Sequence, residues 1–318
     1  MLSCKIIVTL GENLNYAFPD PHPLNKKRYE LFLKELRTSN ILKEGYAEII
    51  EGNFASEENL LLFHSKSYIE FVKRMSEYGS GYLDYGDTPV FKGVFEASSY
   101  VVGSTLIAID KVFENKNIHA FNPIGGLHHA FFDRAAGFCV FNDPAIAIIY
   151  ARKKYGIKKI LYFDIDAHHG DGVYYSFESD PYVYIVDFHE SGNYLFPGTG
   201  FDYERGKGEA YNTKLNIPLE PFSGTKEFLR EFEKVKEFLK DKEFDLILFQ
   251  CGTDGMKDDP ITHLEYTETV HFETAKYLHR LAHERCKGRI VAMGGGGYNP
   301  ENVAKGWMKV IEAMTKLD

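Results

Sequence analysis

The residues best suited to chemistry lie close together at 164–172, where the sequence reads DIDAHHGDG directly after the apolar run ILYF. Side chains alternate between two faces along a strand, so Asp164, Asp166 and His168 would share one face if the strand continued to His168. Two carboxylates and an imidazole at this spacing suit metal ligation or a hydrogen-bonded relay. The glycines that follow would let the backbone turn into a helix beginning near Asp171. The alternative interpretation is a turn with an aspartate cap and solvated histidines.

A further carboxylate, Asp254, follows a second apolar run in the segment FQCGTDG at 249–255. Asp166, His168 and Asp254 would together supply three metal ligands. Structural zinc sites usually have four protein ligands, whereas catalytic sites have three plus a water, so this set indicates a catalytic site. The two carboxylates favour zinc but leave Fe²⁺, Co²⁺ and Mn²⁺ open. Taken alone, Asp254 is equally well explained as a turn or cap residue.

Two adjacent histidines, His128 and His129, follow a pair of glycines that permits close approach of the backbone. Neighbouring imidazoles are candidates for a general base and a general acid. Asp164 and Asp171 could each accept an imidazole N–H, which would fix the tautomer and raise the basicity of the ring. A histidine pair standing alone would more often have a packed or solvated structural role.

Tyr298 follows four consecutive glycines at 294–297. Backbone without side chains can approach a ligand closely, and a tyrosine O–H is a hydrogen-bond donor at neutral pH. Opposite a metal, this phenol could polarise a carbonyl and stabilise the oxyanion formed when water attacks. A phosphate-binding loop is the alternative, but the run lacks the Lys-Ser/Thr pair and the GxGxxG spacing of such loops.

The elements that must position these residues alternate between short β-branched or aromatic runs and longer segments of helical period, a pattern typical of a parallel sheet covered by helices. We predict strands at 4–9, 118–121, 158–164, 182–187, 244–249 and 289–293. We predict helices at 25–36, 66–77, 91–114, 143–155, 226–239, 263–284 and 302–316. Because no repeat or linker divides the chain, we expect one doubly wound α/β domain over residues 1–318. The polar clusters mainly follow predicted strands, so they should converge at one rim of the sheet.

Composition limits the class of protein. The chain has 318 residues, of which 44% are hydrophobic and 26% charged, which excludes disordered and collagen-like classes. Its net charge of −9 argues against binding nucleic acid or an anionic membrane. Four cysteines without a CxxC pair predict reduced thiols and a cytoplasmic location. No apolar stretch approaches the roughly 20 residues of a membrane span, and we identify no export signal.

The sequence resembles the histone deacetylase family, specifically its class I-like branch that includes bacterial and archaeal acetoin-utilisation deacetylases. Six segments in the family's order carry the resemblance: PIGGLHHA at 123–130, GFCVFND at 137–143, DIDAHHGDG at 164–172, FPGTG at 196–200, GTD at 252–254 and GGGGY at 294–298. The resemblance implies the arginase/deacetylase fold, with a mainly eight-stranded parallel sheet and helices on both faces.

The same resemblance assigns roles to individual residues. The implied zinc ligands are Asp166, His168 and Asp254. The implied catalytic residues are His128, His129, Asp164, Asp171 and Tyr298. In this scheme His129 shuttles the proton and is oriented by Asp171, while His128 is its electrostatic partner and pairs with Asp164. Tyr298 polarises the substrate carbonyl during attack by a metal-activated water.

Substrate contacts are also implied. Phe138 and Phe196 match two aromatic walls around an acyl-lysine stem, whose methylenes each gain about 0.8 kcal/mol on burial. Gly126 would add a backbone contact. Asp87 matches a rim carboxylate that holds substrate N–H groups, although a turn aspartate before a proline explains it nearly as well. Arg28 resembles a residue near an internal acetate exit channel.

A structural K⁺ site is expected near Asp164, Asp166 and His168. In the family this site commonly includes a serine hydroxyl, at a position where the chain has Asp187. A carboxylate can still bind a cation, so K⁺ remains expected while its ligand set departs from the family's pattern.

The leading functional hypothesis is a zinc-dependent amidohydrolase that removes acetyl groups from acetyl-lysine side chains of proteins. Hydrolysis of acetylated polyamines is the alternative, although we identify no inserted dimerising loop of the kind those relatives carry. A ureohydrolase with two manganese ions fits less well because the chain has a single Asp-x-His. A non-catalytic acyl-lysine binder would not need the catalytic residues. The expected partner is thus an acetylated protein or small acetylated amine, and the oligomeric state stays open.

Overall fold

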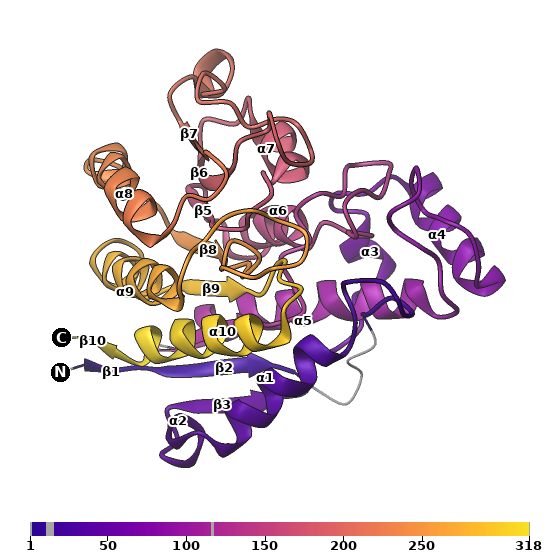
Figure 1. Ribbon diagram of the computed structural model, residues 1–318, viewed down its shortest axis with the longest axis horizontal. Coiled ribbons are helices and arrows are strands. Elements are labelled where there is room, and N and C mark those ends of the chain that lie inside the picture. The colour runs from indigo at the N-terminus through magenta and orange to yellow at the C-terminus, as the bar shows by residue number, and fades with distance from the viewer. Residues whose placement is uncertain (1, 11–15, 116–117, 318) are drawn as a thin grey trace.

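The architecture is built on one eight-stranded sheet in which all neighbouring strands are parallel (Figure 1). The computed structural model describes residues 2–10, 16–115 and 118–317. In spatial order the strands are β3 (Ala47–Ile50), β2 (Lys5–Thr9), β4 (Ile118–Asn122), β9 (Ile290–Met293), β8 (Leu246–Gln250), β5 (Ile160–Asp164), β6 (Val183–Glu190) and β7 (Lys214–Leu219). A short antiparallel pair, β1 (Leu2–Ser3) with β10 (Lys316–Leu317), brings the two ends of the chain together.

Helices cover the sheet in two layers. The described helices are α1 (Lys27–Thr38), α2 (Asn40–Lys43), α3 (Glu57–Leu60), α4 (Lys66–Tyr78), α5 (Val94–Glu114), α6 (Asp143–Tyr155), α7 (Asp171–Phe177), α8 (Thr225–Leu239), α9 (Glu268–Arg285) and α10 (Pro300–Thr315). In one layer α8 contacts α9, α9 contacts α10, and α10 contacts α1, whereas α5, α6 and α7 contact one another in order in the other. No helix in the described part of the chain is long and apolar enough to span a membrane.

Local sequence signals explain where several elements begin and end. Helix α6 begins after Asn142, whose side chain accepts the N–H of Ala145, and it ends at Gly156 in the left-handed conformation. The central strands β5 and β8 are buried along their whole length. A parallel strand covered by helices on both faces has no solvent side, which accounts for the continuous apolar runs.

The predicted α/β fold class, with an eight-stranded parallel sheet, is confirmed. Each predicted strand overlaps an observed one, and α7 begins at Asp171 as expected. Strands β3 and β7 were not predicted, and both lie at the edges of the sheet. Their sequences contain Glu48 in one case and Asn216 and Pro218 in the other, and such residues are tolerated at an edge but weaken a sequence pattern.

Parallel pairing aligns the carboxyl ends of the central strands in one row. Asn122 pairs with Met293, Met293 with Gln250, Gln250 with Asp164, and Asp164 with Asp187. Chain segments that are far apart in the sequence, such as those after Asn122 and Met293, therefore leave the sheet at neighbouring points.

Phe121→Ala should test the core between the sheet and the helices that cover it. Phe121 is fully buried and its ring meets Phe32 and Trp307 edge-on. We expect a loss of about 3 to 5 kcal/mol in unfolding free energy from denaturant titration. Phe132→Ala, at a residue 58% exposed, should change it by less than about 1 kcal/mol. Equal effects of the two substitutions would contradict this packing.

Candidate active site

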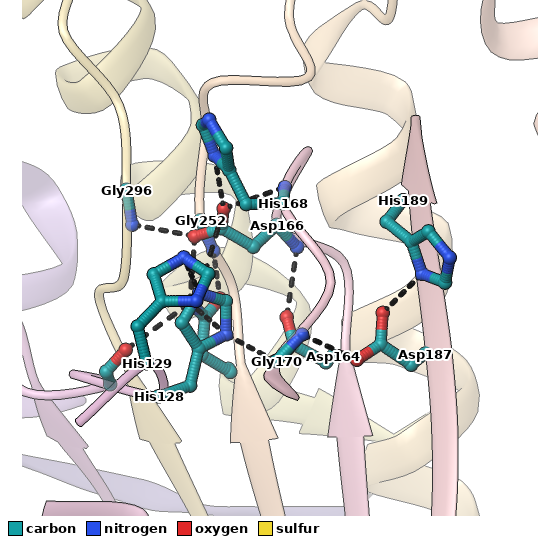
Figure 2. A network of polar contacts seen from close by, with 12 residues as sticks. His128, His129, Asp164, Asp166, His168, Gly170, Asp187, His189, Gly252 and Gly296 are labelled. Carbon is teal, nitrogen blue, oxygen red and sulfur yellow. Dashed lines mark hydrogen bonds and ion pairs between the residues drawn. The ribbon is translucent and has the colours of Figure 1, made fainter. Parts of the chain in front are cut away.

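The candidate site lies beyond the carboxyl ends of β4, β9, β8 and β5, which are neighbours in the sheet (Figure 2). Backbone pairing continues past the strands: the Gly295 N–H donates to the Gly125 carbonyl, and the Thr253 N–H donates to the Gly296 carbonyl. These bonds tie the segments after β4, β9 and β8 to one another, and the Ile165 N–H, just after β5, donates to the Gln250 carbonyl at the end of β8.

The three predicted metal ligands converge on one point. His168 Nδ1 lies 3.1 Å from Asp166 Oδ1 and 2.9 Å from Asp254 Oδ2. All three side chains are buried, and one ligand atom from each lies within 4.8 Å of the other two. Adjacent ligands of a tetrahedral zinc are about 3.3 Å apart, given Zn–N and Zn–O distances near 2.0 Å. The spacing and donor types therefore fit a small divalent cation.

The carboxylate of Asp166 is held in place by donors on two other segments. Its Oδ2 accepts hydrogen bonds from Gln250 Nε2 and from the Gly296 N–H, each at 2.7 Å. Gly252 packs against the same carboxylate so closely that an added Cβ would lie 2.2 Å from Oδ2. Asp254 is fixed in a similar way, because its Oδ1 accepts the Ala167 N–H at 2.7 Å.

The electrostatics of this triad also favour a cation. Burial alone would lower the pKa of His168, but its contacts with Asp166 and Asp254 raise that pKa to about 10. Burial, together with the charge of Asp166, raises the pKa of Asp254 to about 7. Buried negative charge must be balanced by positive charge. A proton on His168 can balance it, but so can a metal ion, which is bound by the unprotonated nitrogen of His168.

Each of the two adjacent histidines is paired with its own carboxylate. His128 Nδ1 lies 2.7 Å from Asp164 Oδ2, and His129 Nδ1 lies 2.6 Å from Asp171 Oδ1. In each pair the carboxylate accepts the hydrogen bond, so both Nδ1 atoms carry hydrogen. Both Nε2 atoms then point away from the carboxylates. The two Nε2 atoms are 3.1 Å apart and next to the metal triad (Figure 2).

The two histidines differ in charge. Burial would lower the pKa of His128, but the charges of Asp164 and Asp166 raise it to about 10. Burial and then the positive charge of His128 lower the pKa of His129 to about 4. His129 is consequently the neutral imidazole of the pair at pH 7, the form able to take up a proton.

Tyr298 lies at the end of the glycine run, on the segment that follows β9, a strand between β4 and β8 in the sheet. Its N–H donates to Asp259 Oδ2 at 2.8 Å, and its ring meets Phe138 edge-on at 5.8 Å. Burial and the charges of Asp254 and Asp166 raise the pKa of the phenol well above 10, so it remains a donor. Arg28 is buried behind the glycines and donates to the Gly295 carbonyl at 2.6 Å.

The two phenylalanines predicted to line the substrate stem lie beside Tyr298 and His129. The Phe196 ring lies 5.0 Å from the His129 ring, and Phe138 contacts Tyr298. Phe138 adopts a left-handed backbone (φ 66°), where its N–H donates to Thr88 Oγ1 and its carbonyl accepts the Tyr16 hydroxyl. Two independent hydrogen bonds thus hold this ring in a conformation that a bulky residue rarely adopts.

A cavity of about 290 Å³ opens beside Phe196. The residues that line it are Asp84, Tyr85, Gly86, Asp87, Arg134, Ala135, Ala136, Gly137 and Phe196. Asp84 accepts the N–H groups of Gly86, Asp87 and Thr88 and so fixes the rim loop. Burial, reinforced by Asp84, raises the pKa of Asp87 to about 7. A larger cavity of about 650 Å³, between α1 and α5, has none of the predicted site residues in its lining.

Gly126 and Asp187 have structural partners of their own. The Gly126 N–H donates to Asp143, and its carbonyl accepts from Gln250 Nε2 at 3.3 Å. Asp187 Oδ2 accepts the Gly170 N–H, and its Oδ1 pairs with His189 Nδ1 at 2.7 Å (Figure 2). The Asp187 carboxylate thus places a buried negative charge beside the segment that follows β5.

One step of the sequence argument is wrong in detail. Strand β5 ends at Asp164, so Asp164, Asp166 and His168 do not share a face through continued alternation. Asp164 instead turns to His128 and to the N–H of Asp166. Residues that the sequence analysis missed are Asp84, Asp143, His189, Gln250 and Asp259. Of these, Gln250 carried a signal, because a polar residue ending a fully apolar strand faces the rim of the sheet.

Comparisons with known proteins show which family the sequence matches. A family model described as the histone deacetylase domain matches residues 22–314. The acetoin utilization protein AcuC of Bacillus subtilis is 42% identical over 312 residues, which cover 95% of this chain and 80% of that protein. The AcuC protein of Staphylococcus aureus is 36% identical over 322 residues, covering 98% and 81%.

Among solved structures, the chain is similar to those of histone deacetylase homologues. The crystal structure of a histone deacetylase homologue from Aquifex aeolicus matches with a TM-score of 0.86 at 35% identity, covering 98% of this chain and 84% of that one. A structure of a histone deacetylase homologue complexed with SAHA matches with the same values.

Gly252→Ala should test the metal centre without removing a ligand. The added methyl would collide with the Asp166 carboxylate, so we expect metal affinity to fall by about 100-fold or more, measured by competition with a chromogenic chelator. Gly224→Ala is a matched control, because its added Cβ comes no closer than 3.3 Å to a neighbouring atom. Unchanged affinity in Gly252→Ala would show that Asp166 does not hold the ion in this position.

Proposed function

The chain belongs to the histone deacetylase family, and we propose that it is a zinc-dependent hydrolase that removes acetyl groups from lysine side chains of proteins. In this proposal residues 1–318 act as one catalytic domain. The observation that carries the proposal is the three-ligand set of Asp166, His168 and Asp254 beside two His–Asp pairs. Three protein ligands leave room for water and substrate, whereas a fourth would close the site.

Asp166, His168 and Asp254 would hold Zn²⁺, with Fe²⁺ or Co²⁺ as substitutes. Bound there, the ion supplies Lewis-acid polarisation of the substrate carbonyl and a lowered pKa for a ligated water. We assign proton transfer to His129, whose Nε2 is the free nitrogen of a neutral imidazole oriented by Asp171. His129 takes the proton of the attacking water and later delivers it to the departing amine. His128, charged by its pairing with Asp164, stabilises negative charge nearby.

Tyr298 is the proposed donor to the oxyanion that develops on the substrate. Its phenol keeps its proton, and the Asp259 contact to its N–H fixes the backbone from which the ring projects. A donor that is already positioned needs no reorganisation when charge develops, which is why such groups contribute strongly to catalysis.

The proposed substrate preference rests on the residues around the entrance to the site. Phe138 and Phe196 would line the methylene stem of acetyl-lysine, Gly126 would contribute backbone, and Asp87 would accept N–H groups of a substrate peptide. The support is their position around the site and the cavity beside Phe196 that includes Asp87. A structural K⁺ near Asp164, Asp166, His168 and Asp187 belongs to the same proposal, because Asp187 supplies buried charge there.

Two variants should separate binding of the metal from chemistry. Tyr298→Phe removes only the oxyanion donor, so we expect full metal content and a loss of about 2.7 to 4 kcal/mol in transition-state stabilisation. Asp254→Ala removes a ligand, so the metal ion held by Asp166, His168 and Asp254 should itself be lost. Metal analysis and turnover of both purified variants make the measurement. Wild-type turnover in Tyr298→Phe would exclude the phenol from the mechanism.

Asp87→Asn should separate a peptide substrate from a small amine. Loss of charged hydrogen bonds to a peptide backbone should reduce kcat/KM for an acetyl-lysine peptide by about 1.5 to 3 kcal/mol. N-acetylputrescine has no peptide backbone, so its turnover should change much less. Asp133→Asn, at an exposed residue nearby, is the control. A larger loss with N-acetylputrescine would instead favour acetylpolyamine hydrolysis.

A further inference from the structure

A second group of potential metal ligands lies near the amino ends of the strands, whereas the active site lies beyond their carboxyl ends. It comprises Cys4, His119, His279 and His283, which we call the Cys-His cluster. Cys4 directly precedes β2, and His119 is the second residue of β4, so both lie at the amino ends of their strands. His279 and His283 are one turn apart on α9, near its carboxyl end. In Figure 1 this is the edge where the two chain ends meet.

The four side chains present their ligand atoms at the spacing of a metal site. One atom from each residue lies within 4.8 Å of all the others. Cys4 Sγ is 3.3 Å from His283 Nε2, and His283 Nε2 is 3.4 Å from His119 Nε2. A tetrahedral zinc with bonds of about 2.3 Å to sulfur and about 2.05 Å to nitrogen places its ligands about 3.3 to 3.6 Å apart. These two distances therefore match the edges of such a tetrahedron.

Two of the imidazoles are held by hydrogen bonds to backbone carbonyls. These bonds leave each ring with an unprotonated nitrogen that is available to a metal ion. His119 Nδ1 contacts the Gly288 carbonyl at 2.8 Å, and His279 Nδ1 contacts the Ala313 carbonyl at 3.0 Å. A carbonyl can only accept, so each Nδ1 carries the proton and each neutral ring leaves Nε2 as a lone pair. Metal-ligating histidines are commonly oriented by this kind of bond on the other ring nitrogen.

Hydrogen bonding within the cluster does not satisfy these groups. His279 is fully buried, yet its Nε2 has no hydrogen-bond partner. His283 Nε2 lies near both Cys4 Sγ and His119 Nε2 but can donate at most one hydrogen. A buried nitrogen without a partner is unfavourable, and a cation shared by all four residues removes that cost. His283 is only partly buried, so an ion could enter from its side.

We propose that Cys4, His119, His279 and His283 form a second, structural metal site that binds Zn²⁺ tetrahedrally through one thiolate and three imidazoles. Four protein ligands fill the coordination sphere and leave no position for substrate, which distinguishes this site from the active site. On binding, the Cys4 thiol releases its proton to solvent as the sulfur–metal bond forms. The ion would join the segment before β2 to β4 and α9, three parts of the chain far apart in sequence.

Cobalt spectroscopy tests this proposal, because, of the two groups of potential metal ligands in the described residues, only the Cys-His cluster contains sulfur. Co²⁺ added to the whole metal-free protein should give a thiolate-to-cobalt charge-transfer band in the near ultraviolet and two bound equivalents. Cys4→Ser should abolish the band and one equivalent. Cys286→Ser, which alters another buried cysteine, should keep both. Asp254→Ala should lose the other equivalent and retain the band, so failure at one site is distinguishable from failure at the other.

The wild-type protein provides a measurement that does not depend on the folding of a variant. Zinc X-ray absorption should show one sulfur ligand per zinc at about 2.3 Å in Asp254→Ala, and about half a sulfur ligand per zinc in the wild type, where the signal averages over both sites. The proposal is overturned by a wild-type cobalt spectrum without the charge-transfer band, by a band that survives in Cys4→Ser, or by a zinc spectrum with only oxygen and nitrogen ligands.

Discussion

The structure depends on the stabilisation of several carboxylates that are almost completely buried. Asp164, Asp166 and Asp254 are each at most 1% exposed. An isolated buried carboxylate is strongly unfavourable, so each must have donors or a cation. Asp164 has His128 and the hydroxyl of Tyr162, while Asp166 and Asp254 have backbone N–H groups on one oxygen and His168 on the other. The oxygens that face His168 are those that a metal ion would neutralise.

The sheet topology explains how one chain brings these groups together. The segments that follow β4, β5, β8 and β9 are widely separated in sequence, but the spatial order β4-β9-β8-β5 makes their strands neighbours. Glycines then allow contacts that a side chain would prevent, as at Gly252 and Gly296 against the two ligand carboxylates. The same topology brings Cys4 and His119 together at the amino ends of β2 and β4, where α9 delivers two more histidines.

Much of the site could be predicted because its residues occur in compact segments after apolar runs. The runs at 160–163 and 246–249 identify buried parallel strands, and Asp166, His168 and Asp254 follow them directly. Edge strands β3 and β7 were not predicted because strands at the edge of a sheet tolerate polar residues and proline. Gln250 and Asp259 support other residues through contacts that only the folded chain creates. The Cys-His cluster was not predicted for the same reason, since its members come from three distant segments.

The most direct test of the account is acetate release by the zinc-loaded protein from an acetyl-lysine peptide, with N-acetylputrescine in parallel and a chelator control for each. The account predicts peptide turnover that a chelator abolishes and that added Zn²⁺ restores. Turnover of N-acetylputrescine in preference to the peptide would move the substrate to the polyamines. Absence of turnover with both substrates, at full metal occupancy of the Asp166, His168 and Asp254 site, would contradict the account.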